Sequence, residues 1–321
     1  MKRLWRAIGM IIAMGLMAYF FWFAWRNLDP RLLITTLKQP GTLLALCSAT
    51  LCYMTIYPIT GLAWRQLLLR QGQSRSTVEL TQLIGIAQLA KYIPGNIAQH
   101  ASRAALALKH GIPLPPYVAS IIQETLLASG ASIICGTLLL AFAPSATNLA
   151  EYRWALFLLL AGSIGGTLLF CIDLPPPENP SLLGRLIRMT GGLPGPATTL
   201  KALTAYICNY LMVGLGVWLL ASSLGLADTI DYPLATAAFA LSWILGFLAP
   251  GAPAGLGARE GIMTLILQGH GNSQQIVPLV LLARAACMCG DLLSFAIATL
   301  HASLTAPKST DPHEDRPGIR R

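Results

Sequence analysis

Charged residues are scarce along this chain. Only 11% of its 321 residues are Asp, Glu, Lys or Arg, and 55% are hydrophobic, whereas about 25% of residues are charged in soluble domains. This shortage excludes an ordinary water-soluble enzyme. Acidic residues are the scarcest, 13 against 22 Lys and Arg, which gives a formal net charge of +9. In so apolar a chain, we attribute the excess to anionic lipid headgroups and orientation in a membrane, and expect no nucleic-acid partner.

Motifs for catalysis and metal binding are missing as well. The sequence has no H-E-x-x-H, Walker A or G-x-S-x-G pattern. Its seven cysteines lie mostly inside apolar runs, without the spacing of a zinc or disulfide framework, and its five histidines are scattered. We therefore expect no enzyme activity, no cofactor and no metal site.

Long apolar segments are abundant, and about 20 residues suffice to cross a hydrocarbon core of about 30 Å. The segment nearest the N-terminus ends in Trp22 and Trp25, which are typical interfacial anchors, so we interpret it as a mature helix. Residues 305–321 are rich in proline and charge and predict a disordered cytoplasmic tail. Charge-free runs that can span the bilayer cover residues 7–25, 39–64, 125–150, 154–172 and 202–227.

Two further stretches, about 81–109 and 233–269, combine apolar residues with internal charges and a Pro-Gly pair, Pro94-Gly95 or Pro250-Gly251. Proline removes a backbone donor and glycine tolerates unusual dihedral angles, so each pair interrupts a helix. The freed backbone groups must then face protein or a wet cavity. We predict a re-entrant hairpin of two half-helices in each stretch; a kinked ordinary span is the alternative.

The two stretches share landmarks at an almost constant offset, which predicts an internal duplication like that of many transporter folds. We expect an all-α polytopic membrane protein of two inverted repeats, residues 1–150 and 151–304, each with three spanning helices and one re-entrant broken-helix hairpin. At offsets of 156 to 160 residues, the matching landmarks are Pro94 and Pro250, Arg103 and Arg259, His110 and His270, and Glu124 and Arg284.

Loop charges favour this inverted arrangement. With the N-terminus inside and both hairpins re-entrant, fourteen Lys and Arg fall on the cytoplasmic side and four outside; if the hairpins instead span, the counts are eleven and seven. The positive-inside rule prefers the first arrangement. Both termini are then cytoplasmic, and the hairpins enter from opposite sides to meet near the midplane, where secondary transporters bind substrate.

Charges that remain inside the membrane segments must face inward, pair, or lie near the interface, because each costs about 2.5 to 3.5 kcal/mol at the bilayer centre. Glu124 and Arg284 occupy equivalent repeat positions, so we expect them to form an ion pair; Asp291, on the same face of the helix as Arg284, is the alternative partner. A structural and a transport role for these three stay equally open. The full set is Lys91, Arg103, Glu124, Arg259, Glu260, Arg284 and Asp291.

Phosphate is the ligand that the remaining cations favour. Lys91, Arg103 and Arg259 lie near the predicted helix breaks, where half-helix N-termini also attract an anion. Glu260 is adjacent to Arg259 and could neutralise it. Such neutralisation would weaken the case for Arg259. The candidate substrate-binding residues are Lys91, Arg103, Arg259 and Glu260.

The motifs around both breaks resemble a known family. Lys91-Tyr92-Ile93-Pro94-Gly95 with Arg103, and Pro250-Gly251 with Gly255-Leu256-Gly257-Ala258-Arg259-Glu260-Gly261 and Arg284, are similar to the paired motifs of the lysylphosphatidylglycerol synthase transmembrane family, the flippase-like region of bacterial multiple peptide resistance factors. The resemblance covers about residues 5–304. It implies a stand-alone flippase-like protein of the bacterial inner membrane, without the aminoacyl-transferase domain.

The favoured hypothesis is therefore a translocase for a phospholipid or lipid-linked glycan, whose anionic phosphate passes the basic midplane residues. One alternative is a non-transporting membrane partner of a glycosyltransferase or lipid-modifying enzyme. The other is a small-solute transporter, since re-entrant hairpins also build channels. The sequence leaves the headgroup, the direction, the energy source and the oligomeric state open.

Overall fold

The computed structural model describes residues 22, 38–92, 98–144, 153–173, 182–249 and 253–305. Within these ranges the chain is helical and contains no strand, which confirms the predicted all-α class. The predicted span 7–25, Trp22 apart, and the tail beyond Thr305 lie outside the described residues. In chain order the elements are α3 (Pro40–Met54), α4 (Ile56–Arg70), α5 (Thr77–Ala87), η1 (Gln88–Tyr92), α6 (Ala98–Lys109), α7 (Leu114–Phe142), α8 (Arg153–Phe170), α9 (Leu182–Met189), α10 (Pro196–Ser223), α11 (Tyr232–Leu248), η3 (Pro253–Gly255), α12 (Ala258–Leu267) and α13 (Ser273–Thr305).

Among the described residues, four helical stretches are long and apolar enough to cross a membrane: α3 with α4, α7, α10 and α13. The predicted span 125–150 differs most from its helix. That helix, α7, begins eleven residues earlier, at Leu114, and ends at Phe142. Pro115 lies in its first turn, where the fixed φ suits a helix and no N–H is needed for an intrahelical bond. Glu124 therefore lies inside a spanning helix, with helical turns on both sides of it.

A break at Thr55 separates α3 from α4 and was not predicted. Pro58, three residues further on, has no N–H to donate to the carbonyl of Met54, and its ring crowds that carbonyl. The break leaves Tyr53 at the end of α3 and Tyr57 at the start of α4, and both tyrosines are buried.

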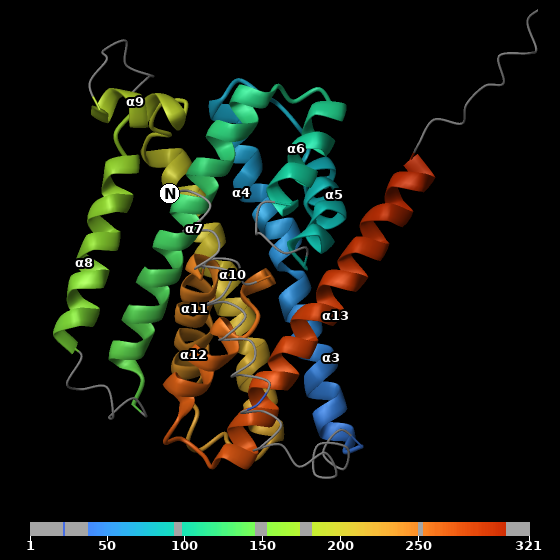
Figure 1. The fold of residues 1–321 in the computed structure, drawn as a ribbon, viewed down its shortest axis with the longest axis vertical. Coiled ribbons are helices and arrows are strands. Elements are labelled where there is room, and N and C mark those ends of the chain that lie inside the picture. Colours follow the sequence, from blue (N-terminus) through green and yellow to red (C-terminus); the bar gives the residue numbers. More distant parts are fainter. Residues whose placement is uncertain are drawn as a thin grey trace, which may run out of the picture.

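Each of the two interrupted stretches forms a pair of short helices. The α5 and α6 helices pack together, as do α11 and α12, and the two pairs approach from opposite ends of the molecule (Figure 1). The two pairs also meet, because η1 of the first contacts η3 of the second. Pro94, Gly95, Pro250 and Gly251 lie outside the described residues.

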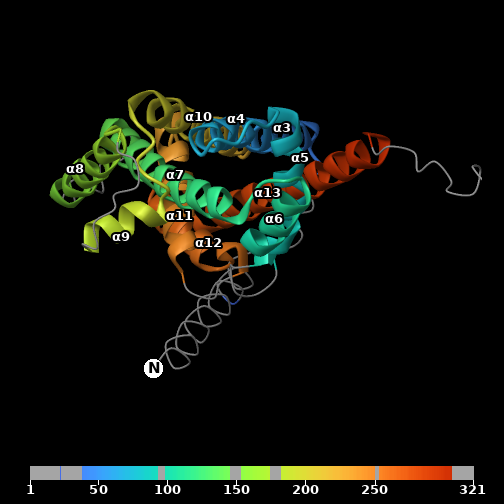
Figure 2. The same ribbon diagram turned by 90° about the horizontal axis from the view of Figure 1, so that it is seen from above.

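Small residues let α10, which lies beside α4 and α3 in Figure 2, pack closely against its neighbours. A Cβ on Gly216 would lie 2.9 Å from the Cα of Ala49 on α3, and one on Gly214 would lie 2.5 Å from the Cβ of Thr236 on α11. Close approach of backbones at small residues is the usual packing mode between membrane helices. Glycine at these two positions therefore fixes how α10 crosses α3 and α11.

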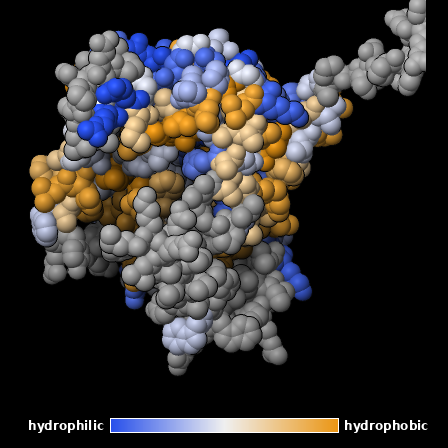
Figure 3. Space-filling model, turned by 45° about the horizontal axis from the view of Figure 1, so that its top comes forward, coloured by the Kyte–Doolittle hydropathy of each residue, from blue (hydrophilic) through white to orange (hydrophobic). Residues whose placement is uncertain are grey.

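Large apolar side chains cover the outer surface of the bundle. On α8, Trp154, Phe157, Leu158, Leu168 and Leu169 are each at least half exposed. Apolar side chains, drawn in orange, form a band across the face in Figure 3, and hydrophilic ones gather at the top of the view. Such a surface is typical of a protein in contact with lipid, because few soluble proteins expose apolar patches of this extent.

Candidate functional site

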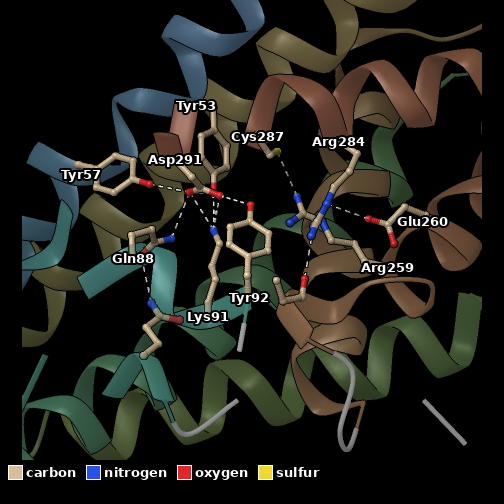
Figure 4. A network of polar contacts seen from close by, with 12 residues as sticks. Tyr53, Tyr57, Gln88, Lys91, Tyr92, Arg259, Glu260, Arg284, Cys287 and Asp291 are labelled. Carbon is tan, nitrogen blue, oxygen red and sulfur yellow. Dashed lines mark hydrogen bonds and ion pairs between the residues drawn. The ribbon is translucent and has the colours of Figure 1, made fainter. Parts of the chain in front are cut away.

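Asp291 on α13 is a fully buried acidic residue with several hydrogen-bond donors around its carboxylate. Its side chain has no exposed surface. Its carboxylate accepts hydrogen bonds from the hydroxyls of Tyr53 (3.0 Å), Tyr57 (2.6 Å) and Tyr92. The Lys91 ammonium lies 2.7 Å from Oδ2 and 2.8 Å from Oδ1. These contacts join α3, α4, η1 and α13 at one carboxylate (Figure 4).

Arg103 on α6 forms a fork-to-fork ion pair with Glu124 on α7. Its Nη1 and Nη2 donate to Oε1 and Oε2 over 2.6 and 2.8 Å. The guanidinium carbon also lies 3.7 Å from the centroid of the Trp64 ring, which is fully buried. Bidentate geometry and stacking are the interactions that a planar guanidinium makes and an ammonium cannot. The charge of Arg103 is thus compensated within the protein, while its Nε is buried without a hydrogen-bond partner among the described residues.

Glu260 and Arg284 form a third, longer ion pair between α12 and α13. Arg284 Nε lies 3.4 Å from Glu260 Oε1, and its Nη1 donates to the carbonyl of Ala254 over 3.3 Å. The other Glu260 oxygen accepts from the backbone N–H of Gly257, at the start of α12, over 2.7 Å. The Nη2 atom of Arg284 is buried without a hydrogen-bond partner among the described residues.

The backbone conformation of η3 positions the Ala254 carbonyl that accepts from Arg284. Ala254 has φ +51°, a left-handed conformation that is uncommon for a residue with a Cβ, and Gly255 follows with φ +70°. A Cβ on Gly255 would lie 3.2 Å from the carbonyl oxygen of Gly246 on α11. Glycine is therefore required here both for its dihedral angle and for the close approach of η3 to α11.

Arg259 differs from the other three basic residues. No carboxylate lies within ion-pair distance of it in the described ranges of the chain. Its guanidinium carbon is 4.3 Å from the centroid of the Phe239 ring, and Nη2 lies 3.8 Å from the Sγ of Cys287. An aromatic face and a thiol stabilise a cation only weakly compared with a carboxylate. Arg259 therefore retains most of its capacity to bind an anion.

All four basic side chains border one internal cavity of about 230 Å³. Figure 4 shows Arg259 and Arg284 reaching into the same region from α12 and α13. An aromatic wall from α10 and α11 borders the same space: Trp243 stacks on Phe247 with ring centroids 5.5 Å apart and meets Tyr210 edge-on at 5.7 Å. The charged residues that line the cavity are Lys91, Arg103, Glu124, Arg259 and Arg284.

The predicted pair of Glu124 and Arg284 does not form, and neither does the alternative pair of Arg284 and Asp291. Glu124 binds Arg103, Arg284 binds Glu260, and Asp291 binds Lys91. The physical reason is the course of α13. It places Asp291 against η1 and the α3–α4 break, and it places Arg284 against η3 and α12. Glu260 does not neutralise its neighbour Arg259, because it turns back to cap its own helix.

Three tyrosines and a glutamine in this network were missed from the sequence. Tyr53, Tyr57 and Tyr92 bind Asp291 directly, and the Gln88 amide lies 3.4 Å from it. One signal was available, because Tyr53 and Tyr57 are four residues apart in the middle of an apolar span. Buried tyrosine hydroxyls need hydrogen-bond partners, so this spacing indicated a polar group facing that helix.

Long apolar helices, an apolar outer surface and a buried cavity with four cations define a multi-pass α-helical membrane protein. The chain matches the family described as the lysylphosphatidylglycerol synthase TM region over residues 7–289. It therefore belongs to that family, as its motifs indicated. None of the curated proteins compared with the chain matches it.

Proposed function

We propose that this protein translocates a phosphate-bearing lipid across the membrane. The observation that supports this most strongly is the internal cavity bordered by Lys91, Arg103, Arg259 and Arg284. Cations inside a membrane protein are costly and mark the paths of ions or substrates. A flippase-like role also fits the family.

The dimensions of the cavity fit a headgroup rather than a whole lipid. Sites for drug-sized ligands measure about 300 to 1,000 Å³, whereas this cavity measures about 230 Å³. A phosphate group can enter and meet the basic side chains. The acyl or polyprenyl chains then stay in the bilayer, alongside the apolar outer surface.

We interpret the two broken-helix pairs as re-entrant hairpins of two inverted repeats. Their approach from opposite ends and the contact between η1 and η3 support this interpretation. A substrate that reaches the contact from either side then meets the same residues, which alternating access requires. α13 holds both breaks, through Asp291 at η1 and Arg284 at η3, so it can couple their movements.

Transport by purified protein tests the proposal directly. We expect liposomes containing the protein to move a fluorescent phospholipid between leaflets. Arg259→Gln should abolish most of this activity and Arg259→Lys should keep part of it, because lysine retains the charge but loses the fork. Lys201→Gln is the matched control, since Lys201 is exposed on α10 and does not line the cavity. Full activity of Arg259→Gln at equal amounts of folded protein would remove Arg259 from the mechanism.

The two alternative functions predict other outcomes in the same experiment. A membrane partner of a glycosyltransferase or lipid-modifying enzyme would move no lipid in liposomes. A small-solute transporter would carry inorganic phosphate into them and leave lipid in place.

The proposed orientation in a bacterial inner membrane has both termini and the α4–α5 turn in the cytoplasm and the α10–α11 turn outside. These turns lie at opposite ends of the molecule (Figure 1). Single cysteines at Ser76 and Asp228, in a background without the native ones, should react with a membrane-impermeant maleimide from opposite sides. Reaction of both from one side would contradict the orientation and the inverted repeat.

A further inference from the structure

The charges around the cavity do not balance. Its lining and the ion-pair partners of that lining contain four basic residues, Lys91, Arg103, Arg259 and Arg284, and three acidic ones, Glu124, Glu260 and Asp291. Three ion pairs account for six of the seven charges. One positive charge remains, and it belongs to Arg259.

Hydrogen-bond donors that are free to bind a ligand belong to Arg259 itself and to Arg284, which lines the same cavity. Arg284, which is 9% exposed, has a buried Nη2 with no hydrogen-bond partner in the ranges described. Among the described residues, the Arg259 guanidinium contacts the Phe239 ring and the Cys287 thiol and no carboxylate. An anion between the two guanidinium groups would receive hydrogen bonds from both and would complete the charge balance.

Building on the proposed function, we infer that the cavity selects a lipid whose headgroup is a phosphodiester with a net charge of minus one, over phosphomonoesters, diphosphates and zwitterionic headgroups. A singly charged phosphate neutralises the one uncompensated cation. A second negative charge finds no free cation, because Lys91 and Arg103 are engaged by carboxylates at 2.6 to 2.8 Å. Between side chains as buried as Arg103 and Arg284, an uncompensated charge carries a large desolvation penalty.

One further base lines the cavity. His100 on α6 has a buried Nδ1 without a hydrogen-bond partner among the described residues. A protonated imidazole would add a second free positive charge. The experiment is therefore run at about pH 8, where an ordinary imidazole is neutral and a phosphomonoester carries close to two charges.

Two lipids that differ by one methyl group test the inference. Purified protein is equilibrated in detergent with equal amounts of dioleoyl phosphatidylmethanol, phosphatidic acid and phosphatidylcholine, repurified, and its bound lipid measured by mass spectrometry. Phosphatidylmethanol is a phosphodiester with one charge, phosphatidic acid is a phosphomonoester, and phosphatidylcholine has no net charge. We expect phosphatidylmethanol to be enriched about tenfold over the other two, which corresponds to about 1.4 kcal/mol. Enrichment of phosphatidic acid, or equal binding of all three, would overturn the inference.

Variants that change the count by one charge sharpen the test. Arg259→Gln makes the cavity neutral and should lose the enrichment of phosphatidylmethanol, while Arg259→Lys should keep it. Gln99→Lys adds a charge to the lining on α6 and should shift binding toward phosphatidic acid. If the lipid ratio is unchanged in folded Arg259→Gln protein, or does not shift in Gln99→Lys, the excess positive charge does not determine which lipid binds.

The readout is binding, so it separates this inference from the proposed function. Selective binding of phosphatidylmethanol without movement of lipid in liposomes would contradict translocation and leave the inference standing. Movement of lipid without this selectivity would contradict only the inference.

Discussion

The two broken-helix regions have similar sequence landmarks but different charge environments. In the first, Arg103 meets Glu124 in a bidentate ion pair. In the second, the matching positions are Arg259 and Arg284, so two cations occur where the first region has a cation and an anion. Glu260 compensates Arg284 and leaves Arg259 as the excess charge. The charge reversal at position 284, together with Glu260 where the first region has Ala104, thus separates a self-contained ion pair from a site that can bind an anion.

Removing the carboxylate of Asp291, which binds Lys91 and three tyrosines, should have the largest effect on stability. Asp291→Asn leaves the Lys91 ammonium buried without a counter-ion and deprives three tyrosine hydroxyls of a charged acceptor. Loss of one partner of a buried pair costs about 3 to 5 kcal/mol. We expect a large loss of folded protein, measured by gel filtration in detergent and by thermal unfolding. Lys91→Met combined with Asp291→Asn should recover part of the loss, and a single variant as stable as wild type would show that the pair is dispensable.

The first region should depend on its ion pair nearly as strongly. Glu124→Gln leaves Arg103 partnered by an amide and the Trp64 ring, and we expect a loss of about 3 kcal/mol. Glu124 is slightly exposed, 14% against none for Asp291, so water reduces the penalty. Thermal unfolding measures the difference, and Arg103→Gln with Glu124→Gln should be more stable than Glu124→Gln alone. If the double variant loses the sum of both single losses, the two side chains do not act as a pair.

The two Pro-Gly interruptions and the charged residues of the site were predicted from the sequence, but the break at Thr55, the tyrosines around Asp291 and the partners within the site were not. Pro and Gly act locally, so the interruptions after η1 and before η3 follow from nearby residues. The cost of membrane charges places Lys91, Arg103, Arg259 and Arg284 inside the protein whatever the packing. Pairing instead depends on how helices distant in sequence cross. Asp291 binds a lysine 200 residues away in the sequence. The spacing of residues in the sequence does not predict how α13 crosses the other helices.

Converting the second region into a copy of the first sharpens the comparison further. In Glu260→Gln with Arg284→Glu, position 284 becomes acidic, as Glu124 is, and can pair with Arg259. The total charge around the cavity falls from one positive to zero. We expect a folded protein, because each remaining charge has a partner, with most lipid movement in liposomes lost. Gln99→Lys added to this variant restores one positive charge and should recover part of the activity. Wild-type activity of the neutral variant would separate transport from the charge excess.

Phe239 should have the smallest effect, because its ring supports Arg259 only through a cation–π contact of 4.3 Å. Such contacts contribute about 0.5 to 2 kcal/mol. Phe239→Leu keeps a large apolar side chain at this buried position of α11, so stability should change little. The guanidinium would lose the surface that orients it in the cavity, and we expect lipid binding to weaken about three- to tenfold, the weakening that about 0.6 to 1.4 kcal/mol produces. Lipid titration followed by thermal shift measures this change, with Phe247→Leu as the control on the same helix. Because Phe247 stacks on Trp243 and not on a cation, its variant should bind lipid like wild type; equal weakening in both would assign the effect to the aromatic wall.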